Sequence, residues 1–221
     1  KEETTIGNYQ FNKLKNNPAY VGYMYGNVLN SSYEQSHANE VDSNMKTVLD
    51  NWYQENIESK GFSSYIADSG FCNDRSLATG DGYSSHMKFT FNAGVRSRNH
   101  QPSLSCAKHD LFTTSSNSLG NENLTYPIGT ITNDELLLAG SLYERINTLN
   151  FTFSEVSYMT MTPFEYLVEP FFAHFSIIEF TGKQSYYGVN STIGVRPVIN
   201  LKADTEISGG IGTSNEPFIV K

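Results

Sequence analysis

Cysteine and histidine are the side chains best suited to chemistry, yet in this sequence they form no recognised reactive set. The five histidines stand apart from one another, at His37, His86, His100, His109 and His174. None belongs to an HExxH motif or to a pair at i, i+4, so zinc binding is not indicated. Cys106 and His109 have the residue types of a nucleophile and its base, but close spacing in a loop is weak support for such a pair. We predict no catalytic site, no metal site and no cofactor.

Two cysteines, Cys72 and Cys106, lie in polar sequence that is typical of loops. A disulfide is useful in such sequence when the protein folds in an oxidising compartment. A bond between the two would stabilise the fold by about 3–4 kcal/mol, mainly by restricting the unfolded chain. We predict this disulfide; the alternative is two free, unrelated thiols.

Residues 164–193 have the composition of a binding surface. Aromatic rings are mixed there with charged and small polar residues, without the clean alternation of a buried strand. Antibody paratopes use the same mixture, in which rigid rings supply contact area and small polar residues supply adaptable hydrogen bonds. We predict an irregular ligand-binding segment in which Tyr166, Tyr186 and Tyr187 are exposed.

The overall composition excludes several classes of partner. The net charge is −8 and the 15 lysines and arginines are scattered, so no basic surface for nucleic acid or for an anionic membrane is indicated. No apolar run is long enough to span a bilayer, so we expect no membrane insertion by this segment. Few charged residues (17%) and many aromatic ones (13%) are typical of a loop-rich extracellular domain. No signal peptide is visible, and we expect a targeting or anchoring segment to lie N-terminal to Lys1.

Two helices are expected among short strands. One begins at Ser43 and ends at Gly61, and the other begins at the capping box formed by Thr132 and Glu135. Strand character is expected at residues 20–26, 65–67, 87–89, 151–153, 158–161, 175–180 and 195–201. This pattern indicates an α+β fold with antiparallel pairing and long irregular loops. We expect a single domain over residues 1–221, in which residues 1–19 either belong to the domain or form a linker or stalk.

The C-terminal sequence GVRPVINLKAD (residues 194–204), with residues 207–210 and 212–215, resembles the end of bacterial and phage proteins that have a C-type-lectin-like fold. Thr-Met-Thr-Pro at residues 160–163 resembles a strand of the same group. Looser likenesses at residues 50–53, 71–76 and 124–129 extend the resemblance over most of the chain. The resemblance implies a C-type-lectin-like fold, related to that of the formylglycine-generating enzymes.

Many members of this group are variable proteins of diversity-generating retroelements, in which a reverse transcriptase mutates adenines in one segment while a fixed end closes the fold. The resemblance implies that residues 164–193 are the variable segment. Scaffold residues would be Phe175, Ile177, Gly182, Val189 and Gly194. The ligand-binding residues would be Phe164, Glu165, Tyr166, Leu167, Glu169, Phe171, His174, Ser176, Ile178, Lys183, Ser185, Tyr186, Tyr187, Asn190, Ser191 and Ile193.

Two features of related proteins are missing from this sequence. Calcium-dependent lectins use Glu-Pro-Asn or Gln-Pro-Asp together with Trp-Asn-Asp, whereas here Phe171 follows the Glu-Pro pair and the only tryptophan is Trp52 on the first expected helix. Calcium-dependent sugar binding is therefore not expected. Formylglycine-generating enzymes use a cysteine pair late in the chain, whereas Cys72 and Cys106 are both early.

The sequence therefore predicts a binding protein and not an enzyme. We expect it outside the cell, on a cell surface or on a phage virion, where residues 164–193 bind a protein or glycan ligand of a host or neighbouring cell. One alternative is a structural, pilin-like surface subunit that assembles through exposed rings. The other is an enzyme that uses Cys106 and His109.

Overall fold

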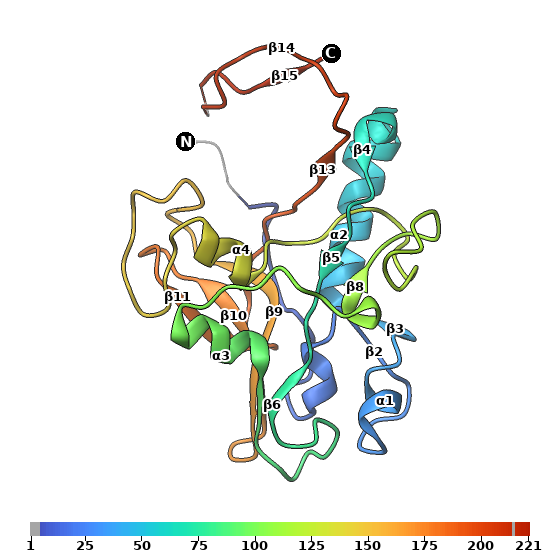
Figure 1. Ribbon diagram of the computed structural model, residues 1–221, viewed down its shortest axis with the longest axis vertical. Coiled ribbons are helices and arrows are strands. Elements are labelled where there is room, and N and C mark those ends of the chain that lie inside the picture. The colour runs from blue at the N-terminus through green and yellow to red at the C-terminus, as the bar shows by residue number, and fades with distance from the viewer. Residues whose placement is uncertain (1–4, 214) are drawn as a thin grey trace.

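A seven-stranded sheet lies at the centre of the fold within residues 5–213 and 215–221, the part of the chain that the computed structural model describes. Its middle consists of three neighbouring antiparallel strands: β9 (Tyr158–Leu167), β10 (Phe172–Ile178) and β11 (Gln184–Gly188). These strands take up most of residues 164–193 (Figure 1). The prediction that this segment is irregular is therefore wrong, because both faces of the sheet are covered and the strands lack the one-sided alternation that identifies a half-exposed strand.

Strands from distant parts of the chain complete the sheet: β1 (Asn8–Tyr9), β6 (Leu77–Thr79), β7 (Phe89–Phe91) and β12 (Ile193–Gly194). β12 runs parallel to β9 and antiparallel to β1, while β7 pairs with the opposite end of β9 and with β6. Because β1 belongs to the sheet and Phe11 is fully buried in the core, this part of residues 1–19 is not a linker. Residues 1–4 of the suggested linker lie outside the described residues.

The helices within the described residues are α1 (Tyr33–Ser36), α2 (Asn44–Tyr53), α3 (Asn92–Asn99) and α4 (Asn133–Leu138). Tighter or wider helical turns are η1 (Pro18–Val21), η2 (Gln54–Glu58), η3 (Phe62–Tyr65) and η4 (Lys108–Asp110). The two predicted helices begin where expected: Ser43 caps α2, and Thr132 and Glu135 form the capping box of α4. α3 was not predicted because its sequence has no apolar stripe.

One face of the sheet packs against the main hydrophobic core. Met45 and Leu49 of α2 are fully buried in this core with the suggested scaffold residues Phe175 and Ile177 of β10. The ring of Phe11 lies 5.4 Å from that of Phe175, measured between centroids. The other suggested scaffold residues are buried as well: Gly182, Val189 and Gly194.

α3 and α4 cover the opposite face of the sheet (Figure 1). α3 lies so close to β9 that a Cβ atom on Gly94 would come within 2.5 Å of the carbonyl oxygen of Phe164. From α4, Asn133 Nδ2 donates a hydrogen bond of 2.7 Å to Ser176 Oγ on β10. The buried hydroxyl of Ser176 is thus hydrogen-bonded by the helix that covers it.

Several predicted strands are shorter than expected or are missing, among them residues 87–89, of which only Phe89 is in a strand. In residues 20–26 only β2 (Met24–Tyr25) is a strand, because Asn17 caps the turn η1 immediately before it. Residues 151–153 form a turn in which the side chain of Asn150 accepts from Thr152 N at 2.8 Å. In residues 195–201 only β13 (Asn200–Leu201) is a strand, since Pro197 has no backbone donor.

Four two-stranded sheets surround the central sheet within the described residues, and their remaining strands are β3 (Val41–Asp42), β4 (Ile66–Ala67), β5 (Phe71–Cys72), β8 (Leu111–Phe112), β14 (Ile207–Gly209) and β15 (Ile219–Val220). β13 pairs with β4, and β14 pairs with β15 in a hairpin that stands away from the rest of the molecule (Figure 1). Ser214, within the C-terminal motif, lies outside the described residues. The mixture of helices and small antiparallel sheets confirms the predicted α+β class.

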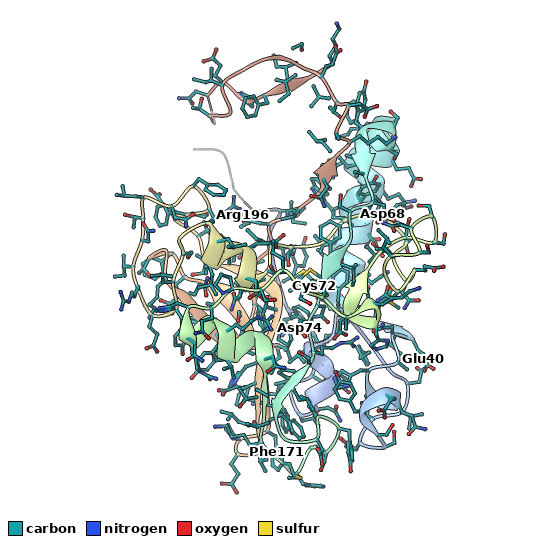
Figure 2. The ribbon with its side chains drawn as sticks, viewed as in Figure 1. Glu40, Asp68, Cys72, Asp74, Phe171 and Arg196 are labelled. Carbon is teal, nitrogen blue, oxygen red and sulfur yellow. A yellow bond between two sulfur atoms is a disulfide. The ribbon has the colours of Figure 1, made fainter. Side chains whose placement is uncertain are left out.

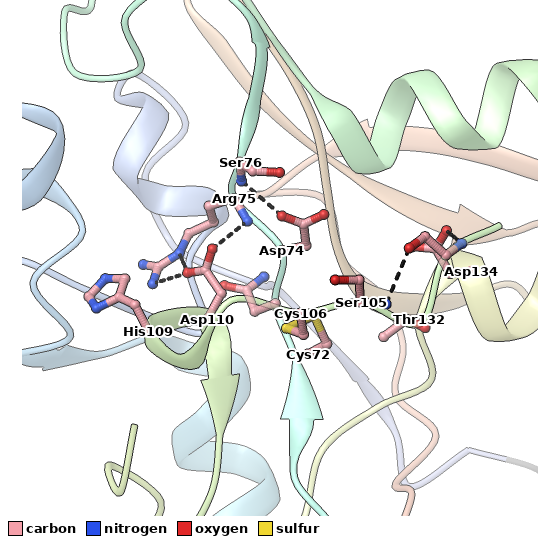
Figure 3. The surroundings of a disulfide bond; sticks show 12 residues. Cys72, Asp74, Arg75, Ser76, Ser105, Cys106, His109, Asp110, Thr132 and Asp134 are labelled. Atoms are coloured by element: carbon pink, nitrogen blue, oxygen red, sulfur yellow. Dashed lines mark hydrogen bonds and ion pairs between the residues drawn. A yellow bond between two sulfur atoms is a disulfide. The ribbon is translucent and has the colours of Figure 1, made fainter. Parts of the chain in front are cut away.

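The predicted disulfide between Cys72 and Cys106 is present (Figure 3). It joins β5 to the irregular segment that leads into η4. Among the described residues no helix combines the length and the apolar character that crossing a membrane requires.

Candidate functional site

Six of the predicted ligand-binding side chains are buried. They are at most 8% exposed: Phe164, Glu165, Tyr166, His174, Ser176 and Ile178. The predicted exposure of Tyr166 is wrong, because its ring stacks on that of Phe89 at 5.7 Å between centroids. Its hydroxyl lies 3.1 Å from the carbonyl oxygens of both Asn16 and Ser85. The rings at the centre of the sheet therefore fill the interior, and a ligand reaches only what lies at the margin.

The other predicted residues lie at the margin of the sheet. Phe171 is 42% and Tyr187 43% exposed, which confirms the prediction for Tyr187. Glu169 is exposed too, in the turn between β9 and β10. The rest are half-buried: Leu167, Lys183, Ser185, Tyr186, Asn190, Ser191 and Ile193. Figure 2 places Phe171 at the end of the molecule that is farthest from the C-terminal hairpin.

Five rings in successive contact, here named the ring row, cross the face of the sheet on the side of α3 and α4; the contact between His174 and Tyr186 is tilted and the other three are stacked. Centroid distances along it are 5.6 Å from Phe172 to His174, 5.0 Å from His174 to Tyr186, 4.5 Å from Tyr186 to Phe164 and 5.7 Å from Phe164 to Tyr143. The rings come from β9, β10, β11 and the loop after α4. Phe164 and His174 are buried, whereas the other three rings are half-buried, so the row leads from the interior to the surface.

A cation lies over a ring face toward each end of the ring row. Lys15 Nζ is 3.6 Å from the centroid of the Phe172 ring, and Arg98 Cζ is 4.2 Å from that of Phe164. Each cation is attracted to the negative face of its ring, by about 0.5–2 kcal/mol. Both side chains are half-buried and therefore remain within reach of a ligand.

Glu165 is the acidic partner of this group. Its Oε2 lies 2.8 Å from an Arg98 nitrogen and its Oε1 lies 3.6 Å from His174 Nδ1. Burial by itself would raise the pKa of Glu165, but His174 and the Arg98 guanidinium outweigh it, so the pKa of this carboxyl lies below its ordinary value. His174 Nδ1 has no hydrogen-bond partner within the described residues. Glu165 is therefore held between Arg98 and His174 beside the ring row.

Helix α3 positions the side chain of Arg98. Gly94 lets the helix approach β9 closely, and Arg98, one turn further on, then reaches both Phe164 and Glu165. Sequence reasoning missed four residues of this site: Lys15, Arg98, Tyr143 and Phe172. Phe172 lies inside the predicted segment 164–193, beside Phe171, but was not among the residues chosen there. Lys15, Arg98 and Tyr143 lie on separate segments that only the tertiary fold brings together with it.

A second concave region of about 280 Å³ lies beside the disulfide. Asp74 and Asp134 line it (Figure 3), but both are already paired. Nitrogen atoms of Arg96 lie 2.7 Å from Asp134 Oδ2 and 2.8 Å from Asp74 Oδ2. These two carboxylates are therefore occupied in holding α3, α4 and the segment after β5 together.

The alternative pairing of Cys106 with His109 is wrong, because Cys106 is bonded to Cys72 and has no thiolate to offer. His109 Nε2 instead donates to the carbonyl oxygen of His37 at 2.7 Å. In the part of the chain that the structure describes, no group of three or more His, Cys, Asp or Glu side chains is placed to hold a metal ion.

Comparison with protein-family models, with curated proteins and with solved structures finds no match to this chain. The geometry of the ring row and the exposed surfaces of the molecule are therefore the basis for a functional proposal.

Proposed function

We propose that this chain is a non-enzymatic, ligand-binding module with a C-type-lectin-like fold. The observation that carries the proposal is the ring row with Lys15 and Arg98 beside it. Rings held in place by stacking lose little side-chain entropy on binding, and aromatic and arginine side chains dominate binding energy at protein interfaces. The C-terminal residues 194–204 support the fold proposal through their resemblance to proteins of that group.

The partner that we propose is a protein or a glycan on a host or neighbouring cell. Half-buried ring edges with fixed cations suit a ligand that offers apolar area together with hydroxyl or carbonyl acceptors. This role places the chain outside the cell, at a cell surface or on a phage virion. The disulfide supports that location, because such bonds persist in oxidising compartments.

Diversification by a retroelement is proposed only for the positions that reach the surface. These are Leu167, Glu169, Phe171, Lys183, Ser185, Tyr186, Tyr187, Asn190, Ser191 and Ile193. The buried positions tolerate few replacements, since an enlarged side chain in a packed core costs about 1–3 kcal/mol. The test is the gene's neighbourhood: a near-copy of this coding segment must lie beside it, with adenines where the surface codons differ. A locus without such a copy contradicts the proposal.

Binding itself is tested with the purified chain on a printed glycan array and on whole bacterial and host cells. We expect signals that fall about tenfold or more, equivalent to about 1.4 kcal/mol, in the double variant Lys15→Gln, Tyr186→Ser. Both side chains are at least partly exposed, so the thermal midpoint should stay within about 2–4 °C of the parent. Phe218→Ser, at a ring in the C-terminal hairpin that is 56% exposed, is the control and should bind normally. Equal loss in both variants, or no binding by the parent, contradicts the proposal.

A further inference from the structure

The loop between α4 and β9 has the reverse of the usual arrangement of polar and apolar side chains. Leu149 is 96% exposed and Phe151 is 85% exposed. Their polar neighbours Asn150, Thr152 and Ser154 are buried, at 8%, 5% and 3%. A loop normally turns its polar groups to water. The exposed apolar side chains therefore mark this loop as a candidate contact surface.

Hydrogen bonds of the buried polar residues hold this loop in place. The carbonyl oxygen of Thr152 accepts from Tyr158 Oη at 2.8 Å and from an Arg196 nitrogen at 2.7 Å. Asn150 Oδ1 accepts from both the backbone nitrogen (2.8 Å) and the hydroxyl (2.7 Å) of Thr152. With the backbone fixed on both sides of Phe151, Leu149 and Phe151 cannot fold inward without breaking these bonds.

Further exposed apolar side chains lie in the loop and on the segments that flank it. Leu138 at the end of α4 is 59% exposed, Ile146 is 69% exposed and Phe180 after β10 is 63% exposed. The loop is tied to both flanks, by Asn147 Nδ2 donating to Gly140 O and by Phe180 N donating to Ser157 Oγ, each at 2.9 Å. Together the five side chains expose roughly 500 Å² of apolar surface, on segments that these hydrogen bonds join. We call Leu149 and Phe151 with these three neighbours the apolar loop.

An apolar groove of about 310 Å³ lies elsewhere on the same chain. Ile57 and Ile66 form its buried part, while Phe62, Leu201 and Val220 are 49%, 44% and 38% exposed around it. An apolar cavity of about 150 Å³ is enough for one benzene ring. The groove therefore has room for a phenylalanine ring and a neighbouring leucine side chain.

We propose that the apolar loop of one copy of this chain inserts Leu149 and Phe151 into the groove of a second copy. The two features match in size and in apolar character, and each lacks a partner within the described residues. In Figure 1 the loop lies at the left edge of the molecule, whereas β4 and β13, which line the groove, lie at the upper right. A chain therefore cannot fill its own groove with its own loop.

Contact between two different surfaces is head-to-tail, and such contact leaves a free loop at one end and a free groove at the other. Assembly then continues beyond a dimer, into an open filament or a ring. The net charge of −8 opposes close packing of copies, so we expect assembly to strengthen as salt screens this repulsion.

The test is sedimentation velocity of the purified chain over a range of concentrations up to about 1 mM, because an interface of this size can be weak. We expect the parent to form species larger than dimers as concentration rises. The loop variant Leu149→Ser, Phe151→Ser and the groove variant Phe62→Asp, Leu201→Asp should each remain monomeric. Leu149 and Phe151 are 96% and 85% exposed, and Phe62 and Leu201 are 49% and 44% exposed, so both variants should stay folded, which comparison with the parent's circular dichroism spectrum checks. Leu119→Ser, at a side chain that is 77% exposed but lies outside both surfaces, is the control and should assemble like the parent.

Mixing the two variants gives the sharpest result. The loop variant still has a groove and the groove variant still has a loop, so an equimolar mixture should form one-to-one dimers that do not grow. A monomeric parent at all concentrations overturns the proposal, as does a mixture that stays monomeric. If only the loop variant loses assembly, two loops pack against each other and the groove assignment is wrong. Cosedimentation of the parent, but not of the loop variant, with phosphatidylcholine vesicles would assign the loop to a bilayer instead.

Discussion

Asn73, Asp74 and Arg75 show what the residues after Cys72 do. Asn73 Oδ1 accepts from Tyr23 N at 2.9 Å, and its Nδ2 donates to Met161 O at 2.6 Å. Arg75 is fully buried, and its guanidinium bonds Asp110 and the carbonyl oxygen of Met24. Each of these side chains joins segments that are far apart in the sequence. This stretch is therefore explained by internal hydrogen bonding and contributes nothing to the ligand surface.

Asp110→Asn tests the buried ion pair with Arg75. The carboxylate of Asp110 lies 2.6 Å from Arg75 and is 5% exposed, so its loss leaves a buried guanidinium without a countercharge. We expect a loss of about 3–5 kcal/mol in the free energy of unfolding, measured in urea. Arg75→Met combined with Asp110→Asn removes both charges and should recover part of that loss. A single variant that loses less than about 1 kcal/mol would show that water reaches the pair.

His37 gives the fold a dependence on pH. Burial, followed by repulsion from Arg75, lowers the pKa of His37 to about 3. In the unfolded chain this imidazole takes up a proton near pH 6.5, whereas in the folded protein it does not, so acidification favours unfolding. Its contribution to stability is complete above pH 6.5 and is lost as the pH falls toward 3, by about 2–3 kcal/mol at pH 4.5.

His37→Phe keeps a ring against Tyr33 and removes the titration. We expect the variant to be about 1 kcal/mol less stable at pH 7, because it loses the hydrogen bond of 3.0 Å from His37 Nδ1 to Tyr33 O. Between pH 6.5 and 4.5 its unfolding free energy should fall less steeply than that of the parent. His86→Gln, at an exposed histidine, should leave the parent's slope unchanged. Equal slopes in His37→Phe and the parent would show that His37 is protonated in the fold.

Among the helices and strands, those with local signals were predictable and those without were not. α2 and α4 have capping residues next to apolar positions, and both begin where the sequence indicates. α3 has neither signal, because its close packing on β9 depends on Gly94 rather than on an apolar stripe. The strands of residues 164–193 were misjudged because covering helices make both of their faces buried. For the same reasons the ring row was not predicted, since its geometry depends on α3 and on the pairing of β9, β10 and β11.

Gly94→Ala tests the contact between α3 and β9. Alanine is the better helix former by about 1 kcal/mol, but its Cβ would lie 2.5 Å from Phe164 O, and such overpacking costs about 1–3 kcal/mol. We expect a net loss of up to about 2 kcal/mol in urea unfolding, together with weaker ligand binding as Arg98 moves off Phe164. Asn99→Ala, exposed at the end of the same helix, should change stability by less than about 0.5 kcal/mol. A more stable Gly94→Ala protein would show that α3 and β9 are farther apart.

The molecule as a whole is closed by its C-terminal segment. Gly194 pairs with β1 and β9, Val198 bridges to Gly129, and β13 pairs with β4. Arg196 lies between these contacts, with its guanidinium 4.7 Å from the centroid of the Tyr158 ring. The segment GVRPVINL thus joins the N-terminal strand, the central sheet and the middle of the chain, which gives a structural reason for its composition. Ile199 and Leu201 of the same segment also line the apolar groove, so this segment both joins the parts of the fold and contributes to the proposed assembly surface.

The disulfide closes the middle of the chain in the same way. Cys72 and Cys106 are separated by 34 positions, and restricting a loop of that length in the unfolded state contributes about 4 kcal/mol. Since a domain of this kind is stable by only about 5–15 kcal/mol, the bond is a large part of the total. We expect the variant Cys72→Ala, Cys106→Ala to lose about 2–5 kcal/mol in urea unfolding, and a reductant to destabilise the parent similarly while leaving the variant unaffected. Because Ser103, next to the bond, donates from its backbone to Asp134 at 2.9 Å, hydrogen exchange in residues 100–107 should rise in the variant more than in the central sheet. An unchanged unfolding midpoint in the variant would mean that the central segment is held by its hydrogen bonds alone.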